Sequence, residues 1–427
     1  MAKKTKNDIA WEEIFKEYSI LDYIAKQGFY EILASEIREY REPRLMCKFD
    51  HENNLPDIFA ENNLSILPIS RKAYVIGRFS LFARVEYDEE IPIEMSAPYN
   101  LQTLKENDLY SESAALNFAY HSGMINHFLG EKTRHTVSGR MGSGNFSYNV
   151  LSKEGQMKTV DVEGAQIEID GGFEGSNFFA LVEAKKEKAS DFNVRQLFYP
   201  YRVWRKRIGK DVVPVFFTHS NDIFSFFMYK FEDEDVFNSF KLVKRQNYIV
   251  AHDKITHHDL DELANNVTEF VTEPKVPFPQ ADSFVRVIDL LANLYTSDIS
   301  KDEITTLYDF DKRQTDYYAN SCVYLGLATS YKDDNETMIK LNDEGRRVME
   351  LPYRQKYLTL ASKILEHEVF KEVYDYYVKN GEVSKDYIVN RMKENNLYNI
   401  NSDSTFKRRS STIRGWIEWI RSLPNNS

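Results

Sequence analysis

The sequence contains only two cysteines and no long apolar segment. Cys47 and Cys322 lie in unrelated contexts, so we expect no disulfide framework and a reducing, cytoplasmic location. No apolar run approaches the roughly 20 residues that cross a bilayer, and the residues before Trp11 include no apolar core of a signal peptide. We therefore expect no membrane partner.

Several motifs of well-known chemistry are also missing. The glycine-rich loop 138–145 lacks the Gly-Lys-Ser/Thr ending of a nucleotide-binding loop, so we expect no ATP. The nine histidines show no i,i+4 pairs, which argues against a structural zinc. No Gly-x-Ser-x-Gly motif supports a serine hydrolase.

The formal net charge of −11 argues at first against a nucleic-acid partner, but the charge is unevenly distributed. Basic residues outnumber acidic ones in 183–210 and again in 391–421. Lysines and arginines that neutralise phosphates release counterions and give sequence-independent DNA affinity. The candidate DNA-binding residues are Arg195 and Arg202 in the first stretch, Lys407, Arg408, Arg409 and Arg414 in the second, and Arg140 in loop 138–145.

The pattern of apolar residues divides the chain into regions. Residues 1–100 begin with a helical segment, 8–40, and form an N-terminal region that contacts DNA or is structural. Residues 101–271 alternate strands and helices, which predicts an α/β (α+β) core. Its expected helices are 113–129 and 191–208, and its expected strands are 165–173, 178–185, 212–218 and 223–231.

The chain then becomes almost wholly helical. Three prolines in 272–280 predict a linker at 272–281. Two helix-turn-helix-like modules, 282–350 and 351–427, are expected beyond it, the first with a hairpin at 328–343, so that the C-terminal region is winged-helix-like. In the last expected helix, 403–421, an apolar stripe that includes Trp416 leaves a basic, hydroxyl-rich side for DNA.

The candidate catalytic residues lie in a predicted hairpin, 169–185. If Phe173 pairs with Phe178, Asp170 lies opposite Leu181 and on the same face as Glu183 and Lys185. Two carboxylates and an ammonium then converge at the open end of the hairpin. The alternative interpretation is a charged, solvated strand end.

This convergence suits metal-assisted cleavage of a phosphodiester. Mg²⁺ prefers oxygen ligands, usually one or two carboxylates with waters and a substrate phosphate oxygen. Asp170, Glu183 and the backbone carbonyl of Ala184 are the candidate ligands. Lys185 would orient or help deprotonate the attacking water and stabilise charge in the transition state.

The segment Asp170…Glu183-Ala184-Lys185 resembles the signature of the PD-(D/E)XK nuclease superfamily, specifically of type II restriction endonucleases. The stretches 192–202, 44–50 and 66–69 are similar to further pieces of such enzymes. The resemblance implies a restriction-endonuclease-like core, Mg²⁺, a homodimer acting on double-stranded DNA, a companion DNA methyltransferase and a bacterial host. It also implies catalytic assistance by Gln196 and an additional acidic ligand, for which Glu112 is the candidate; the alternative role of Glu112 is a favourable charge at a helix N-terminus.

Two other functions remain open from the sequence. One is a non-catalytic DNA-binding regulator with a vestigial nuclease core. The other is a glycosidase that uses Asp170 and Glu183 as its pair of carboxylates. The presence of Lys185 beside both carboxylates, with a basic helix following, favours the nuclease over either alternative.

Overall fold

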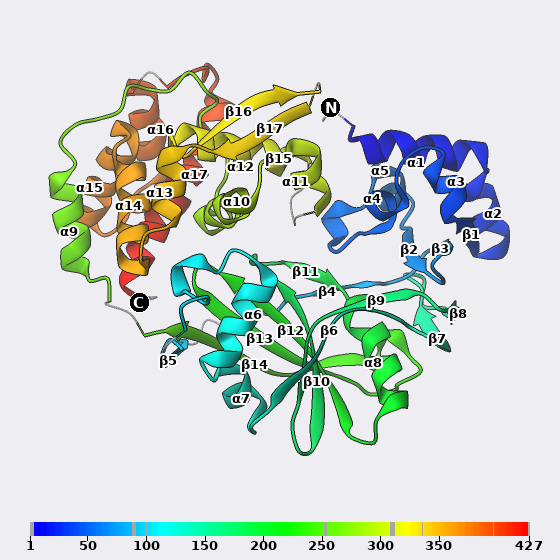
Figure 1. The fold of residues 1–427 in the computed structure, drawn as a ribbon. Helices are drawn as coiled ribbons and strands as arrows, with labels where there is room; N and C mark the ends of the chain where they lie inside the picture. Colours follow the sequence, from blue (N-terminus) through cyan, green and yellow to red (C-terminus); the bar gives the residue numbers. More distant parts are fainter. Residues whose placement is uncertain are drawn as a thin grey trace.

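A computed structural model describes residues 4–87, 91–98, 101–251, 254–307, 312–334, 336–395 and 397–425. The fold is mixed α/β with a helical C-terminal region, and the N-terminal and C-terminal regions both lie over one side of the central sheet (Figure 1). Within the described part of the chain, no helix is long and apolar enough to cross a membrane.

The N-terminal region packs short helices around a three-stranded sheet ordered β1-β3-β2. Its core contains Trp11, Phe15 and Phe59 in edge-to-face contact. The prediction of helix throughout 8–40 is wrong at 29–33, because Gly28 ends α2 in the left-handed conformation and the next residues pair with β3. The elements are α1 (Lys6–Glu17), α2 (Ile20–Gln27), β1 (Phe29–Leu33), α3 (Ala34–Arg38), α4 (Pro43–Cys47), η1 (Glu52–Asn54), α5 (Asp57–Glu61), β2 (Ser65–Pro68) and β3 (Ala73–Gly77).

The central region is built on a seven-stranded sheet ordered β5-β14-β13-β12-β10-β9-β6. Strands β10 and β12 are parallel and are connected by helix α8, whereas β9 and β10 form an antiparallel hairpin. The strands of the sheet are β5 (Ile93–Met95), β6 (Arg134–Gly142), β9 (Gln166–Glu174), β10 (Phe178–Lys185), β12 (Asp211–Ser220), β13 (Ile223–Phe231) and β14 (Phe240–Val250).

Helices cover both faces of this sheet. Ala180, Val182 and Ala184 of β10 pack toward α6 (Glu112–His121) and α7 (Met124–Leu129), while Phe179 and Leu181 pack toward α8 (Arg195–Arg207). Strand β10 is therefore apolar on both faces, as expected for a parallel strand inside a sheet. The first predicted helix, 113–129, is in fact two helices, because Gly123 adopts a left-handed conformation between them.

Several short elements extend the central region. Strands β4 (Phe82–Arg84) and β11 (Asp191–Asn193) pair with each other, and β7 (Asn145–Leu151) pairs with β8 (Met157–Glu163). Residues 191–193 were predicted as the start of a helix but form β11, and residues 138–142 were predicted as a loop but belong to β6. Strands β4 and β5 lie in the range assigned to the N-terminal region, yet both pair with strands of the central region.

The C-terminal region consists of helices around one small sheet ordered β15-β17-β16. In the second expected module, helices α14 and α15 follow each other directly and are separated only by Glu366 and His367. The elements are α9 (His257–Asn266), α10 (Phe284–Thr296), β15 (Ile299–Ser300), α11 (Lys301–Leu307), α12 (Lys312–Tyr324), β16 (Ala328–Asp333), β17 (Glu336–Leu341), α13 (Asp343–Met349), α14 (Tyr353–Leu365), α15 (Glu368–Asn380), α16 (Lys385–Glu394), α17 (Asp403–Ser422) and η4 (Leu423–Asn425).

The proline-rich segment 272–281, predicted as a linker, is packed along these helices rather than free. Phe278 and Ala281 are buried, and Trp416 Nε1 donates a hydrogen bond to the carbonyl of Ala281. Arg409 donates to the carbonyl of Phe278. The prolines therefore shape an extended segment that lies against α17 and belongs to the C-terminal core.

Candidate active site

The candidate site is built on the β9–β10 hairpin, whose register differs from the sequence prediction. Phe173 pairs with Ala180, not with Phe178, which moves the pairing by two residues. A shift of two preserves the alternation of faces. The pairing ends with Gly171 and Val182, one residue short of Asp170 and Glu183, so the two carboxylates are close neighbours along the hairpin.

Asp170 also lies at a β-bulge that sequence alternation did not reveal. Gly172 pairs with Val137 and Ile169 pairs with Gly139, so Asp170 and Gly171 lie opposite the single residue Ser138 of β6. Bulges redirect side chains and are frequent beside active sites. Asp170 Oδ2 accepts a hydrogen bond from the amide of Ala184, 2.7 Å away, which fixes the carboxylate against β10.

Glu183 and Lys185 are buried side by side at the end of β10. Lys185 Nζ lies 2.8 Å from Glu183 Oε1. The same carboxylate oxygen accepts a hydrogen bond of 2.5 Å from Gln196 Nε2, on the first turn of α8. The other amide atom, Gln196 Oε1, is buried without a hydrogen-bond partner among the described residues. The structure therefore brings together Asp170, Glu183, Lys185 and Gln196, all chosen from the sequence.

Helix α6 adds Glu112, its first residue. Ser111 caps the helix by accepting a hydrogen bond from the amide of Ala114, and this fixes where the helix begins. Glu112 lines the same cleft as Asp170 and Glu183. The position fits both interpretations, since a helix N-terminus favours a negative charge.

The electrostatics of the site indicate an excess of negative charge. Burial raises the pKa of Asp170 to about 6, and the nearby Glu112 carboxylate adds to the effect. Burial raises the pKa of Glu183 to about 7, with Lys185 opposing this rise and Asp170 adding to it. Burial also raises the pKa of Glu112. Carboxyl groups with raised pKa values that gather at one place are typical of functional sites.

Asp50 is a member of the site that sequence reasoning missed. It comes from the N-terminal region, and its Oδ2 lies 3.4 Å from Lys185 Nζ. Burial opposes ionisation of Asp50, but Lys185 and then Lys48 hold its pKa below the ordinary value. In turn, burial opposes the charged form of Lys185, but Asp50 and then Glu183 raise the pKa of Lys185 well above its ordinary value. Lys185 is therefore held as an ammonium between two carboxylates.

The backbone around Asp50 is anchored on the central region. The carbonyl of Asp50 accepts a hydrogen bond of 2.9 Å from the amide of Asn193. The neighbouring His51 is buried and lies between Asp191, at 3.1 Å, and Glu187, at 3.4 Å. In the sequence, Asp50 is distinguished only by its place in the stretch 44–50, which is similar to a piece of restriction enzymes. That similarity assigns no role to Asp50 itself.

The site opens into a cleft of about 620 Å³ between the N-terminal and central regions. Arg140 and Arg195, two of the arginines expected to bind DNA, line it. Arg140 is exposed and lies 3.1 Å from Glu168. Arg38, Arg44, Lys48 and Arg71 from the N-terminal region line the cleft as well. The floor is acidic and the walls carry most of the basic residues.

The residues at the floor fit a divalent cation of the Mg²⁺ type in donor chemistry. No cluster of three or more His, Cys, Asp or Glu side chains arranged to hold a metal occurs in the described residues. Mg²⁺ does not require one, since one or two carboxylates with waters are its common ligand set. Asp170 and Glu183, both with raised pKa values, and the unpartnered Gln196 Oε1 supply oxygen atoms that a cation would satisfy.

Other predicted DNA-binding residues have different environments. Arg202 is 5% exposed, donates to the carbonyls of Glu234 and Ser147, and pairs with Asp235 at 2.6 Å. Its guanidinium is therefore buried in the packing of α8 and bonded to protein groups, which weakens the prediction that it binds DNA.

In α17, Lys407, Arg408 and Arg414 are exposed, whereas Arg409 is half-buried against Phe278. Arg414 donates to the carbonyl of Val383. Thr412, one of the hydroxyl-bearing residues of this helix, is fully buried and donates to Asp282. The basic surface of this helix is therefore smaller than the sequence predicted.

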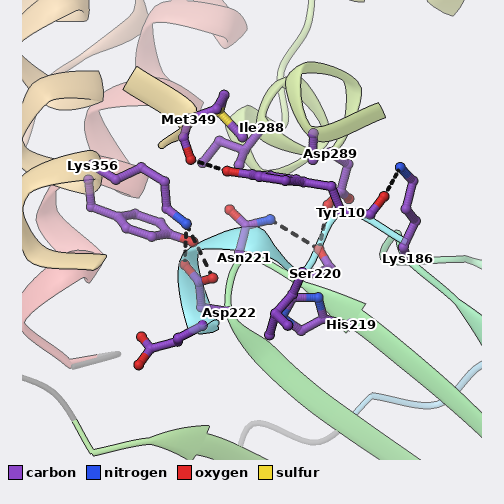
Figure 2. Close-up of a pocket in the computed structure, with 14 residues that line it drawn as sticks. Tyr110, Lys186, His219, Ser220, Asn221, Asp222, Ile288, Asp289, Met349 and Lys356 are labelled. Atoms are coloured by element: carbon purple, nitrogen blue, oxygen red, sulfur yellow. Dashed lines mark hydrogen bonds and ion pairs between the residues drawn. The ribbon is translucent and has the colours of Figure 1, made fainter. Parts of the chain in front are cut away.

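A second, small cavity of about 30 Å³ lies behind the site, where the central and C-terminal regions meet (Figure 2). Lys186 donates a 2.6 Å hydrogen bond to the carbonyl of Tyr110, whose hydroxyl donates to the carbonyl of Met349. Lys356 pairs with Asp222 at 2.9 Å. Met349 of the C-terminal region therefore contacts the segment that leads into α6. The same segment accepts a hydrogen bond from Lys186, the residue that follows β10.

Comparison with protein families gives three successive matches, each described as a domain of unknown function: DUF6996 over residues 8–76, DUF6997 over 77–249 and DUF7226 over 286–425. No curated protein and no solved structure matches the chain. The first boundary falls at the end of β3 and the last match begins within α10, so the three families follow the N-terminal, central and C-terminal regions of the fold.

Proposed function

We propose that the chain is a Mg²⁺-dependent, sequence-specific endonuclease of the type II restriction class, which hydrolyses phosphodiester bonds of double-stranded DNA. The observation that carries the proposal is the meeting of Asp170, Glu183 and Lys185 at the floor of a cleft lined by arginines. The strand, helix and strand that position them, β10-α8-β12, with the β9–β10 hairpin, support a restriction-endonuclease-like core. A bacterial cytoplasm, a homodimer and a companion methyltransferase belong to the same proposal.

The side chains have distinct roles in this reaction. When bound, Mg²⁺ polarises the phosphoryl oxygen and lowers the pKa of a bound water. Asp170, Glu183 and the Ala184 carbonyl would hold the ion, with Glu112 available as a further acidic ligand. Lys185, kept charged by Asp50, is suited to orient the water and to stabilise negative charge in the transition state rather than to accept a proton. Gln196 fixes the orientation of Glu183.

The C-terminal region is proposed to hold the DNA. The order helix α10, strand β15, helices α11 and α12, and hairpin β16–β17, with the sheet order β15-β17-β16, supports a winged-helix-like module. In the second module, Lys407 and Arg408 are exposed on α17 and suit contacts with phosphates.

The test is incubation of the purified protein with long duplex DNA and Mg²⁺, followed by electrophoresis. Discrete fragments are expected, and their formation should cease when EDTA replaces Mg²⁺. Asp170→Asn and Lys185→Met should each lower the cleavage rate at least about a hundredfold, because they remove a candidate ligand and a transition-state cation. Asp161→Asn, on exposed β8, is the matched control and should cut normally.

The outcomes separate the competing functions. DNA binding by the wild type without any fragments would instead support a regulator with a vestigial core. Cleavage that persists in both Asp170→Asn and Lys185→Met would place the active site elsewhere. Hydrolysis of a glycoside by the wild type but not by Asp170→Asn would support the glycosidase.

A further inference from the structure

The N-terminal region forms one wall of the cleft that leads to the candidate active site. We propose that Arg44 and Arg71, both in this wall, bind backbone phosphates of the DNA strand that is cut. The inference rests on the proposed function and extends it, since it assigns the N-terminal region a direct part in substrate binding. These arginines are not in either basic stretch of the sequence.

Both arginines are exposed side chains on the cleft. Arg44 lies on α4 and Arg71 in the turn between β2 and β3. Neither guanidinium has an ion pair with a carboxylate among the described residues, which distinguishes them from Arg140, paired with Glu168 at 3.1 Å. An unpaired guanidinium beside an acidic floor is suited to phosphate, which accepts two parallel hydrogen bonds from arginine.

The segments that carry the two arginines are fixed against the rest of the molecule. Trp11 Nε1 donates to the carbonyl of Met46 in α4, and Asn193 Nδ2 donates to the carbonyl of Phe49 just beyond it. Near Arg71, the Tyr199 hydroxyl donates to the carbonyl of Pro68. Both ends of the wall are therefore attached to the central region, and little ordering is needed when a ligand binds.

Arg71 lies at the end of this wall that is close to the central sheet. A Cβ built on Gly142, the last residue of β6, would lie 3.7 Å from Arg71 Nη2. Ile69, two residues earlier, accepts a hydrogen bond of 2.7 Å from the amide of Glu163. Arg71 is therefore placed over the strand edge that also carries Arg140, while Arg195 lines the cleft from α8.

Electrostatics explain why such residues are needed. A phosphodiester that approaches Asp170, Glu183 and Glu112 meets like charge, and the whole chain has a formal charge of −11. Cations on the walls of the cleft offset this repulsion locally. Arginines that contact the backbone position the strand without reading its sequence.

The experiment compares Arg44→Ala/Arg71→Ala with Lys26→Ala/Lys72→Ala. The second pair removes the same charge from exposed residues of the same region, including the residue next to Arg71, but neither lysine lines the cleft. Binding of a fluorescein-labelled, mixed-sequence 40-base-pair duplex is measured in EDTA by anisotropy at several salt concentrations, and cleavage in Mg²⁺ is measured in parallel. Thermal unfolding verifies that all variants are folded.

The expected result is about tenfold weaker duplex binding by the arginine variant, with a slope of log K against log salt that is smaller by about 1.8, since each neutralised phosphate contributes about 0.9. The lysine variant should match the wild type. An arginine variant that binds with the affinity and salt slope of the lysine variant, while the wild type cuts DNA, would overturn the inference and leave the proposed function standing. A wild type that neither binds the labelled duplex nor cuts long duplex DNA would overturn the proposed function itself.

Discussion

The carboxyl group of Asp170 is held in surroundings that favour its neutral form, and this has a consequence for stability. Its pKa rises from an ordinary value near 3.9 to about 6 in the folded chain, because the group is buried close to Glu112. Between these two values the folded state keeps a proton that the unfolded state has released. The free energy of unfolding therefore falls as the pH rises through this window.

Asp170→Asn should remove this dependence. In EDTA, the variant should be more stable than the wild type at pH 8 by at most about 3 kcal/mol, since one pKa unit corresponds to about 1.4 kcal/mol, and the two should be nearly equal close to pH 4. Urea unfolding at several pH values measures the difference. Mg²⁺ at pH 8 should stabilise the wild type but not the variant, because a ligand stabilises only the state that binds it. A difference that is independent of pH would contradict the account.

A separate prediction concerns the effect of Asp50 on the pKa of Lys185. Removing the carboxylate 3.4 Å from the ammonium should lower the pKa of Lys185, because Asp50 makes the largest contribution that favours its charged form. In Asp50→Asn, the loss of cleavage activity at alkaline pH should therefore begin at a lower pH than in the wild type. Lys48→Met, which leaves the pair of Asp50 with Lys185 intact, is the control. An alkaline limit that is the same in all three proteins would show that Asp50 does not maintain the charge of Lys185.

At the scale of elements, the approach of α6 to β9 depends on Gly171. A Cβ on this residue would lie 2.7 Å from Leu116 Cδ2 of α6. The absence of a side chain allows the helix that begins with Glu112 to pack close to the strand that carries Asp170. Gly171 thus links the geometry of two candidate ligands.

Gly171→Ala should destabilise the fold by about 1–3 kcal/mol, the usual cost of overpacking a core, and should lower the cleavage rate because α6 is displaced. Gly209→Ala is the control, since a Cβ there meets no atom within 4 Å. Chemical denaturation and the DNA cleavage assay measure the two effects. Equal stability of the two variants would show that α6 does not depend on close contact with Gly171.

Elements could be predicted correctly from the sequence where one local pattern of apolar residues dominates. The buried strand β10 and the amphipathic helix α17 lie close to their expected ranges, and Trp416 is in the core as expected. Strand β14 was missed because most of residues 241–247 are polar and most are at least partly exposed, so that apolar alternation is weak. The β9 bulge and the role of Asp50 depend on partners distant in the sequence, which local patterns do not report.

At the scale of the whole molecule, the three regions contact one another in pairs. Asn193 joins the central region to Asp50, and Lys356 of the C-terminal region joins it at Asp222. Arg41 of the N-terminal region pairs with Asp302 of the C-terminal region at 3.1 Å. These contacts hold the cleft and the C-terminal modules in one arrangement, so that the proposed binding and cutting depend on all three regions.

The described residues of one chain contain one such hairpin with its candidate site, whereas a duplex has two strands to cut. A two-fold symmetric pair of chains presents one site to each strand. We therefore expect wild-type protein to convert supercoiled plasmid to linear DNA with little nicked circle. Mixing it with a tenfold excess of Asp170→Asn should make most active pairs carry a single working site.

In that mixture the ratio of nicked to linear product should rise severalfold, because one strand is cut and the other is not. Competition for DNA by the inactive chain slows both cuts and does not by itself change the ratio, so electrophoresis of the products distinguishes pairing from competition. A mixture whose ratio equals that of the diluted wild type would show that a single chain cuts the two strands in succession. The expected rise would show that cleavage of both strands requires the association of two acidic chains. High salt screens the repulsion between these chains and should favour their association, although it weakens the binding of phosphates.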